Sequence, residues 1–453
     1  MSSSAGESTR PGAAAQKVSA TLALALLVFI NLFNYIDRQV LAAVEPQIRK
    51  ELFPADVSGR EPVHAKAATG WFATAFLLSY MGIAPLFGLL ADRVSRWWLV
   101  GFGVILWSLA SGGSGVNWGV SLASAYWILL LTRCFVGVGE AAYGPVAPAM
   151  IADLYPVAKR GQVMSCFYMA IPVGGALGYA LGGGIVKLYG DAQWRWAFYS
   201  VVPLGVALGI WCFFMPDPPR GQTEQAVTMA PQRKLTFKDY LYLLTIPSYT
   251  LNTLGMTMMT FAIGGLAFWM PAYLEERSVL DVGPIDSKTM FGAITAVAGL
   301  VSTLAGGLAG DCLRPRFSGS YFLVSGFALL LGFPMTLLMM WTPFPWAWVF
   351  VFLAVFFLFF NTGPTNTILA NVIHPSMRGS AFALNILIIH ALGDAISPPL
   401  IGWISGGQAH LDRGFIVVSL AMLVGGIIWL MGAKYLKHDT EMAPSRLPPL
   451  QHN

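Results

Sequence analysis

Long apolar stretches recur along almost the whole of this 453-residue chain and limit what it can fold into. A helix that crosses a bilayer needs about 20 predominantly apolar residues, whereas a membrane-spanning β-strand has about 10 residues of alternating polarity. The stretches lie at residues 18–48, 67–91, 97–117, 121–150, 160–188, 195–215, 247–274, 288–310, 319–342, 345–372, 378–406 and 413–436. They are too long and continuous for such strands. The pattern predicts an all-α integral membrane protein with twelve membrane-spanning helices.

Charged residues make up only 11% of the chain, whereas a soluble domain carries about 25%. The larger share of the Lys and Arg residues falls in the two tails, the central loop and those connections that lie on the same side as the tails. By the positive-inside rule, both termini are predicted to be cytoplasmic in a multi-pass protein of the plasma membrane, which in a bacterium is the inner membrane. The net charge of +5 therefore indicates topology, and no basic face predicts a nucleic-acid partner.

Two halves of the chain share landmarks in register. "GLLAD" recurs as "GLAGD" 219 residues later, and Pro156 and Pro375 keep the same spacing. Parallel repeats of six helices are the architecture of one transporter fold, whose substrate site lies near the midplane between the halves. The expected segments are a cytoplasmic N-tail at 1–17, a six-helix bundle at 18–215, a cytoplasmic linker at 216–246, a second six-helix bundle at 247–436 and a cytoplasmic C-tail at 437–453.

Ionisable residues lie deep inside predicted helices of the first half: Asp37 and Arg38 in "NYIDR", and Arg133 and Glu140 in the fourth helix. Such residues are costly in lipid, by about 2.5–3.5 kcal/mol each, and are functional candidates by default. Arg133 and Glu140 share one helical face with about 10.5 Å of rise between them. We expect Asp37, Arg133 and Glu140 to cluster, with the two acids exchanging protons. Arg38 points about 100° away from Asp37 and is a secondary candidate. A structural ion pair is the alternative.

Polar side chains within the predicted helices of the second half have two interpretations. Asn361, Thr362 and Asn385 could line the substrate cavity, or they could form hydrogen bonds within the bundle, worth about 0.6 kcal/mol each. Asp394 is the one acid deep in this half, and His390, four residues earlier, can pair with it. His390 and Asp394 are therefore secondary candidates.

Glycines 174, 178 and 182 follow one another at four-residue spacing in the fifth helix. Small residues on one face let membrane helices touch backbone to backbone, so helix packing is the favoured interpretation. The same face could also slide against the eighth helix.

The connection between the second and third helices carries "GLLADRVSRWWL", with a weaker copy, "GLAGDCLRPR", in the second half. This ordered string resembles the signature loop of the major facilitator superfamily. In that family the matching aspartate, here Asp92, belongs to a cytoplasmic charge network and contacts the start of helix 11. The resemblance implies a gating role for Asp92, Arg93, Arg96, Asp311 and Arg160.

Other strings resemble the Spinster family of that superfamily: "NYIDR", "GVGEAAY", "APAMIADLYP" and "FYMAIPVGGALGY". Family members are linked to the movement of sphingosine-1-phosphate and lysophospholipids, and proton coupling is proposed for some. The resemblance implies a secondary active transporter that moves a lipid-like amphiphile by alternating access, with protons exchanged at Asp37 and Glu140. It also implies that Arg133 meets a phosphate. We expect the protein to work as a monomer among membrane lipids.

Two other functions stay open at this point. A proton-coupled symporter of small organic anions would also carry an "N-Y-x-D-R" helix and would bind a carboxylate at Arg133. A membrane-embedded enzyme would need a nucleophile motif or a metal-ligand spacing, and neither G-x-S-x-G nor paired histidine or cysteine spacing occurs. The sequence predicts a carrier that is not an enzyme and needs no cofactor or metal.

Overall fold

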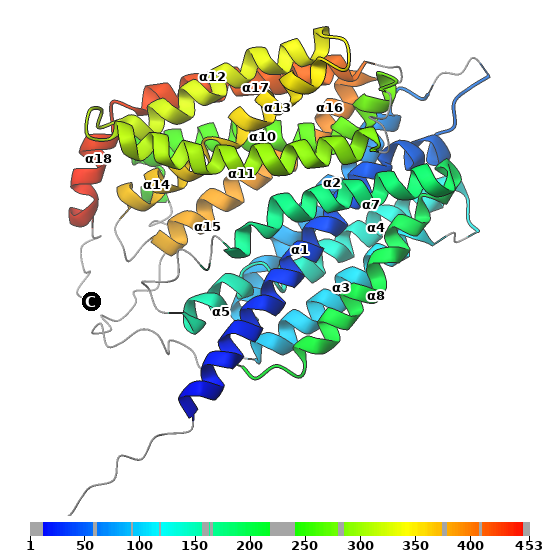
Figure 1. The fold of residues 1–453 in the computed structure, drawn as a ribbon, viewed down its shortest axis with the longest axis horizontal. Helices are drawn as coiled ribbons and strands as arrows, with labels where there is room; N and C mark the ends of the chain where they lie inside the picture. The colour runs from blue at the N-terminus through cyan, green and yellow to red at the C-terminus, as the bar shows by residue number, and fades with distance from the viewer. Residues whose placement is uncertain are drawn as a thin grey trace, which may run out of the picture.

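The computed structural model describes residues 12–57, 61–91, 94–116, 119–155, 163, 166–217, 241–279, 285–373, 378–406 and 410–446. One bundle, lower in Figure 1, contains α1 (Gly12–Leu52), α2 (Ala65–Ala91), α3 (Arg96–Gly115), α4 (Leu122–Ala141), α5 (Val146–Leu154), α7 (Ala170–Tyr189) and α8 (Arg195–Cys212), with the short η1 (Asp191–Gln193) before α8. The other contains α10 (Pro247–Glu276), α11 (Ser287–Leu313), α12 (Ser320–Trp341), α13 (Ala347–Phe359), α14 (Thr362–Val372), α15 (Arg378–Ile389), η3 (His390–Asp394), α16 (Ser397–Ser405), α17 (Leu411–Gly432), α18 (Leu436–Met442) and η4 (Ala443–Ser445).

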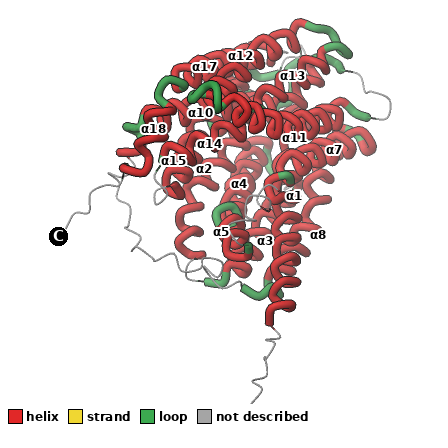
Figure 2. The backbone as a smooth tube through the Cα atoms, turned by 60° about the vertical axis from the view of Figure 1, so that its left-hand side comes forward, coloured by secondary structure: helices red, strands yellow, loops and turns green. Residues whose placement is uncertain are grey.

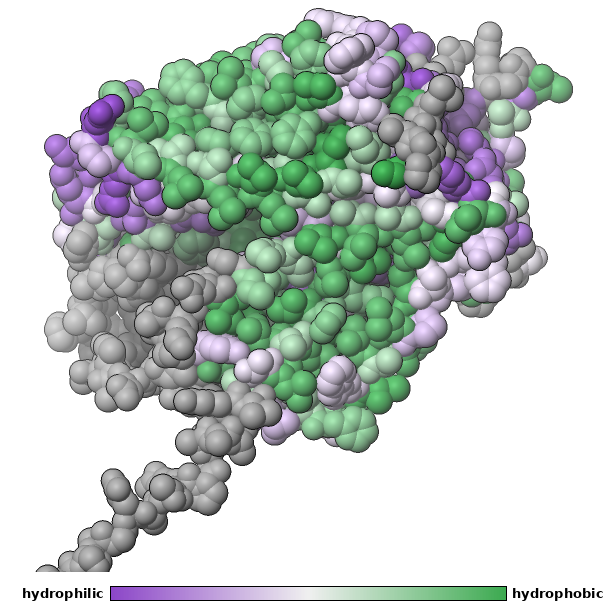
Figure 3. Space-filling view, viewed as in Figure 1, coloured by the Kyte–Doolittle hydropathy of each residue, from purple (hydrophilic) through white to green (hydrophobic). Residues whose placement is uncertain are grey.

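Within the described ranges, twelve helical spans are long and apolar enough to cross a membrane, and each coincides with a predicted stretch. Several of the spans join consecutive helices, among them α4 with the start of α5, η1 with α8, α13 with α14, and α15 with η3 and α16. The face shown in Figure 3 carries an apolar belt with polar residues at both ends, as expected of a surface in contact with lipid. The predicted fold of two six-helix bundles is confirmed.

Local sequence signals fix where several of these helices begin. The Ser95 hydroxyl accepts a hydrogen bond from the backbone N–H of Trp98 at the start of α3, and Asp286 accepts two from the first turn of α11. These side chains satisfy N–H groups that have no partner inside the helix. Helix α10 begins with Pro247, which needs no such partner.

The eleventh span is interrupted in its middle. Helix α15 ends at Ile389, η3 is one turn of π-helix, and α16 starts just before Pro398 and Pro399. The carbonyl of Ile389 accepts a hydrogen bond from the Thr260 hydroxyl of α10 at 2.9 Å. Single π-helical turns inside α-helices occur frequently at functional sites, and prolines leave helix carbonyls without their donors.

The predicted glycine series of the fifth helix, now in α7, packs against α1. A Cβ at Gly178 would lie 2.5 Å from the carbonyl oxygen of Ile36, and one at Gly182 would lie 2.5 Å from the Cβ of Ala43. Helix α11 meets α7 elsewhere, where a Cβ at Gly292 would lie 2.9 Å from the Ala176 carbonyl. The prediction of close packing is confirmed, but the sliding surface against the eighth helix was wrong for these glycines, because their face is occupied by α1.

The two bundles are closest at one end of the molecule. Figures 1 and 2 show the helix axes of the bundles converging where α1 and α10 finish and diverging toward the end that carries α5, α14 and α15. The interface between the bundles is formed by α1 with α10, α2 with η3 and α16, and α7 with α11. The candidate site lies along this interface.

Candidate functional site

A cavity of about 250 Å³ lies between the bundles. Its polar lining comes from both sides, because the first bundle contributes Arg38, Gln39 and Arg133 and the second contributes His390 and Asp394. The rest of the lining is apolar or aromatic: Tyr35, Leu41, Ala42, Ala73, Phe76, Leu77, Val136, Ile263, Gly264, Ala267, Phe268 and Pro398. The cavity therefore combines a few charged groups with a mostly apolar wall.

Arg38 and Glu140 form an ion pair at the edge of this cavity. Nε of Arg38 donates to Oε2 of Glu140 at 2.9 Å, and Nη2 of Arg38 donates to the same oxygen. The guanidinium also lies 4.9 Å from the ring centroid of Tyr35 and 4.7 Å from that of Phe76. Arg38 is thus held by one carboxylate and two aromatic rings, while its side chain stays 27% exposed.

Two glycines hold the fourth helix in the position that brings Glu140 to Arg38. A Cβ at Gly137 would clash with the Phe76 carbonyl of α2, and one at Gly139 would lie 2.7 Å from the Gly103 carbonyl of α3. Only glycine permits this approach of the backbones. The packing that "GVGEAAY" encodes is therefore the direct cause of the position of Glu140.

The expected cluster of Asp37, Arg133 and Glu140 is not formed by direct contacts. Asp37 is fully buried and accepts a hydrogen bond from the Ser111 hydroxyl of α3, while Nη2 of Arg133 donates to the Ser114 hydroxyl at 2.6 Å. Arg38, a secondary candidate from the sequence, is the residue that pairs with Glu140. Two helical turns separate Arg133 from Glu140 along α4, whereas the long side chain of Arg38 reaches across from α1.

Three buried polar atoms at this site have no hydrogen-bond partner among the described residues. They are Oδ2 of Asp37, Nε of Arg133 and Oε1 of Glu140. A buried polar atom without a partner costs free energy, and in a native protein it calls for an explanation. Each of these atoms is able to take up a proton or to bind a ligand.

His390 and Asp394 form the charged wall of the second bundle. Nδ1 of His390 lies 3.0 and 2.9 Å from the two carboxylate oxygens of Asp394, and both residues line the cavity. The predicted pairing of these two side chains is confirmed. Both residues belong to the π-helical turn η3, the first and the last of its five residues.

The three uncharged candidates of the second half do not belong to the lining of this cavity. Asn385 accepts a hydrogen bond from the Thr253 hydroxyl at 2.9 Å, and Asn361 and Thr362 donate to carbonyls of their own helical segment, at 3.3 and 2.8 Å. The alternative interpretation, hydrogen bonding within the bundle, describes all three in this conformation.

The gating candidates are described only in part. Asp92, Arg93 and Arg160 lie outside the described residues. The backbone N–H of Arg96 donates to Asp217 at 3.1 Å. Asp311 accepts a hydrogen bond from the Tyr321 hydroxyl at 2.7 Å, a contact inside the second bundle. The gating role of this set stays a prediction.

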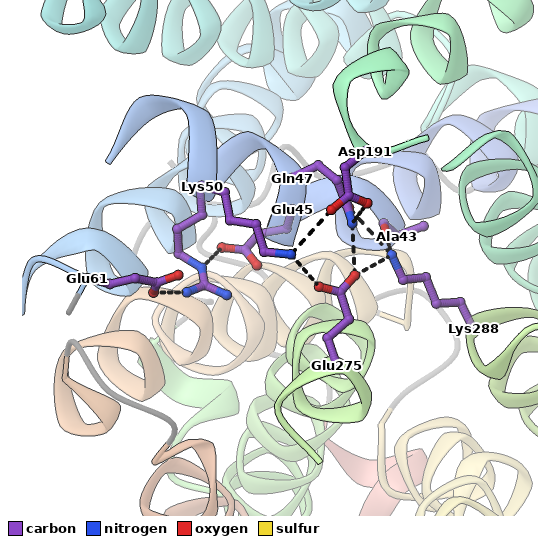
Figure 4. Close-up of polar contacts among 9 residues, drawn as sticks. Ala43, Glu45, Gln47, Lys50, Glu61, Asp191, Glu275 and Lys288 are labelled. Carbon is purple, nitrogen blue, oxygen red and sulfur yellow. Dashed lines mark hydrogen bonds and ion pairs between the residues drawn. The ribbon is translucent and has the colours of Figure 1, made fainter. Parts of the chain in front are cut away.

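A network of charged and amide side chains joins the bundles at their converging end (Figure 4). Nζ of Lys288 in α11 lies 2.9 Å from Oε1 of Glu275 and donates to the carbonyl of Ala43 in α1 at 2.7 Å. Gln47 donates to the same oxygen of Glu275 at 2.9 Å, and Nζ of Lys50 lies 3.4 Å from its other oxygen. Glu275 is therefore shared between the two bundles.

This network was not predicted from the sequence, because Lys288 was used only in the count of Lys and Arg residues that gives the topology. Pro46 lies inside α1, one turn from Ala43, whose carbonyl accepts from Lys288. Asp286 caps α11 and so fixes Lys288 in its first turn. A proline inside a helix, followed by charged residues at facing helix ends, was the available signal.

Comparisons with known proteins point to one family. A sequence profile of the Major Facilitator Superfamily matches residues 27–398. Protein spinster homolog 3 of Danio rerio is 33% identical over 447 residues, covering 93% of this chain and 86% of that protein. Protein spinster homolog 1 of Homo sapiens is 36% identical over 458 residues, covering 95% and 84%.

Two solved structures share the fold. A bacterial homolog of the human lysosomal transporter Spinster, in an inward-facing and unoccupied conformation, matches with a TM-score of 0.76 at 20% identity, covering 96% of this chain and 99% of that one. A D-xylose-proton symporter matches with a TM-score of 0.72 at 18% identity, covering 93% and 99%.

Proposed function

This chain is a transporter of the major facilitator superfamily and belongs to its Spinster family, and we propose that it carries a lipid-like amphiphile with an anionic head by proton-coupled alternating access. The amphiphile is of the sphingosine-1-phosphate or lysophospholipid type. The substrate leaves chemically unchanged, so the protein is not an enzyme.

The observation that carries this proposal is that the central cavity has a charged part and an apolar part. Arg38 and Arg133 offer guanidinium groups that suit phosphate oxygens, and Nε of Arg133 has no partner among the described residues. Phe76, Phe268 and their apolar neighbours offer a surface for the apolar part of the substrate. An amphiphile satisfies both parts at once.

Competition for Arg38 supplies a way to couple substrate to protons. While Glu140 is ionised, it holds Arg38 in the ion pair described above. A proton on Glu140 removes the negative charge from that pair and frees the guanidinium for an anionic head. Asp37, which is buried one residue away with one oxygen unpartnered, is the second proton-binding candidate. Protonation and substrate binding are then favourable to each other.

Alternating access follows from the two ends of the interface. The hydrogen bond from Lys288 to the Ala43 carbonyl and the Lys66–Glu276 pair, at 2.5 Å, both cross the interface and close the end where α1 and α10 finish. Both must break before that end opens, which makes the described state the one open toward the termini. With cytoplasmic termini in a plasma membrane, as the positive-inside pattern predicts, this is an inward-facing state.

A proton-coupled symporter of small organic anions is the second candidate. The size of the cavity favours it, because about 250 Å³ lies below the roughly 300–1,000 Å³ of most ligand pockets. A small carboxylate would then bind between Arg38 and Arg133 without using the apolar wall.

Binding to the purified protein separates the two candidates. The ligands are a lysophospholipid, sphingosine-1-phosphate and a panel of small organic acids, each titrated against the wild type, Arg38→Ala and Arg133→Ala. Saturable lipid binding that both variants weaken supports the amphiphile carrier. Binding of the small acids alone overturns that proposal in favour of the symporter.

A matched control for the arginine variants is Arg195→Ala. Arg195 forms an ion pair with Glu51 at the converging end of the first bundle, outside the central cavity. Its loss removes an arginine–carboxylate pair without changing the cavity. An equal loss of lipid binding in this variant would show that the effect of Arg38→Ala is structural.

A further inference from the structure

A second cavity, of about 450 Å³, lies on the other side of the seam between α2 and the eleventh span. Helix α2 presents Ala73 and Leu77 to the central cavity, and the next residue in each case, Thr74 and Leu78, to this second groove. The eleventh span divides in the same way, since Asp394 faces the cavity and Ala395 faces the groove. The two spaces therefore lie back to back.

One hydrogen bond crosses the partition between them. The Thr74 hydroxyl of the first bundle donates to the carbonyl of Ala395 in the second. That carbonyl lacks its usual helical donor, because the residue four positions later is Pro399. The contact thus depends on a proline that breaks the helix, directly beside the π-helical turn. Such interruptions allow a helix to bend.

The groove opens on the outer surface of two membrane spans. Trp71, Leu78 and Trp403, which line it, expose 47%, 51% and 69% of their side chains, and they lie inside the spans Ala65–Gly88 and Ala381–Ser405. Leu78 lies near the middle of its span, where the medium outside the protein is hydrocarbon, and Trp71 and Trp403 lie nearer the span ends, where tryptophan is common. The occupant of the groove is therefore an apolar chain.

The opposite seam of the transporter, between α7 and α11, has a cavity of about 340 Å³ at the converging end, and its lining is mostly polar and charged, including Lys187, Asp286 and Lys288. Gly292 brings the helices into backbone contact, and the rings of Tyr179 and Phe291 pack edge to face with centroids 5.1 Å apart. The Tyr179 hydroxyl also donates to the Ala267 carbonyl at 2.5 Å. The apolar lining of the groove at the α2–α16 seam suits a hydrocarbon chain, whereas the charged lining at the α7–α11 seam does not.

We propose that the groove between α2 and α16 binds the hydrocarbon chain of the amphiphile and that the substrate passes from the bilayer into the central cavity through this seam when the Thr74–Ala395 contact opens. The inference rests on the proposed function and adds the side of access and a site for the chain. The head then lies near Arg38 while the chain extends across the partition.

Photo-crosslinking of the full-length protein in vesicles tests the groove directly. The probe is a lysophospholipid with a diazirine at the end of its chain, and the control probe is a diacyl phospholipid with the same group. We expect labelling of the peptides that contain Trp71, Leu78 and Trp403 by the first probe, suppressed by excess unlabelled lysophospholipid. If both probes label these peptides equally and excess lysophospholipid does not suppress the labelling, the groove is an ordinary lipid-contact surface and the proposal is overturned.

Transport by groove variants gives a second, independent test. Leu78→Trp fills the groove and should lower uptake of a long-chain lysophospholipid by about tenfold while leaving a short-chain analogue unaffected. Leu304→Trp, at a 70% exposed position of α11 outside the groove, should change neither. If uptake of both analogues falls equally in Leu78→Trp, the proposed entry route through the α2–α16 seam is wrong. If the wild type carries neither analogue, the proposed function itself fails.

Discussion

Nε of Arg38 lies 2.9 Å from Oε2 of Glu140, a contact between α1 and the end of α4 that spans 102 residues of sequence. The Glu140 side chain is 1% exposed, whereas that of Arg38 is 27% exposed. The buried acid therefore sits behind an arginine that faces the cavity. This order of charges places the proposed anion-binding group in front and the proposed proton-binding group behind it.

Replacing Glu140 by Gln should abolish coupling. The change removes the negative charge that holds Arg38 and the carboxyl that would take a proton, and the loss of one partner of a buried pair costs about 3–5 kcal/mol. We expect uptake driven by a pH gradient in proteoliposomes to fall by at least about tenfold, with membrane insertion retained. Glu51→Gln, in the pair with Arg195 outside the cavity, is the control. Gradient-driven uptake at the wild-type rate in Glu140→Gln would contradict the coupling role.

Asp37→Asn should also uncouple transport while preserving the fold, because Asn keeps an acceptor for the Ser111 hydroxyl that bonds the native carboxylate. The measurement is proton flux, followed with a pH-sensitive dye during substrate uptake. We expect substrate exchange without a gradient to continue and the accompanying proton flux to disappear. Unchanged proton flux would remove Asp37 from the coupling set.

Lys288→Met should destabilise the closed end far more than Lys50→Met. The Lys288 side chain is 7% exposed and that of Lys50 is 53% exposed, although both contact Glu275. The buried hydrogen bond that Lys288 donates across the interface to the Ala43 carbonyl is worth about 1.5–3 kcal/mol, whereas the exposed pair of Lys50 with Glu275 contributes about 0–1 kcal/mol. Distances between spin labels at positions 57 and 285 should lengthen in Lys288→Met alone. An equal shift in both variants would show that burial does not set the strength of this closure.

Gly178→Ala should destabilise the first bundle, because its Cβ would lie 2.5 Å from the carbonyl oxygen of Ile36. Overpacking of this kind costs about 1–3 kcal/mol, which thermal unfolding in detergent would detect. Gly184→Ala is the matched control on the same helix, since nothing lies within 4 Å of its Cβ. A stability change in the control as large as that in Gly178→Ala would argue against the packing explanation.

Asp439 of α18 makes the stability of the second bundle depend on pH. It accepts hydrogen bonds from the backbone N–H of Ser248, at 2.8 Å, and from Arg446. Burial opposes ionisation of this carboxyl, but these bonds and the Arg446 charge outweigh it and hold the pKa of Asp439 below its usual value of 3.8. Because the pKa of Asp439 is lower in the folded state, its stabilisation is complete at pH values above the usual pKa. The stabilisation is lost as the pH falls through the pKa of the folded state.

The variant Asp439→Asn should therefore lower the free energy of unfolding at neutral pH by about 1 kcal/mol, as the loss of an N-cap does. Thermal unfolding from neutral pH down to about pH 3 should show the wild type converging on the variant. Glu441→Gln, an exposed acid on the same helix, should follow the wild type. A constant gap between Asp439→Asn and the wild type at all pH values would contradict the linkage.

Helix positions could be predicted closely because a bilayer leaves few alternatives. The seventh stretch was expected at 247–274, and α10 spans Pro247–Glu276. Backbone groups in hydrocarbon must be satisfied within the segment, so length and hydropathy almost define each helix. The pairing of His390 with Asp394 was equally accessible, since residues four apart share a helical face.

The order of apolar and charged residues is sufficient to predict twelve helices in two repeated bundles and to identify the ionisable residues inside them. Which of those residues meet depends on how the helices pack: Arg38, not Arg133, pairs with Glu140, and Lys288 reaches the Ala43 carbonyl of the other bundle. Helical periodicity gives the face on which a side chain lies. The neighbour on that face depends on helix rotation, on close glycine contacts and on the reach of long side chains, and these are fixed only when the helices pack together.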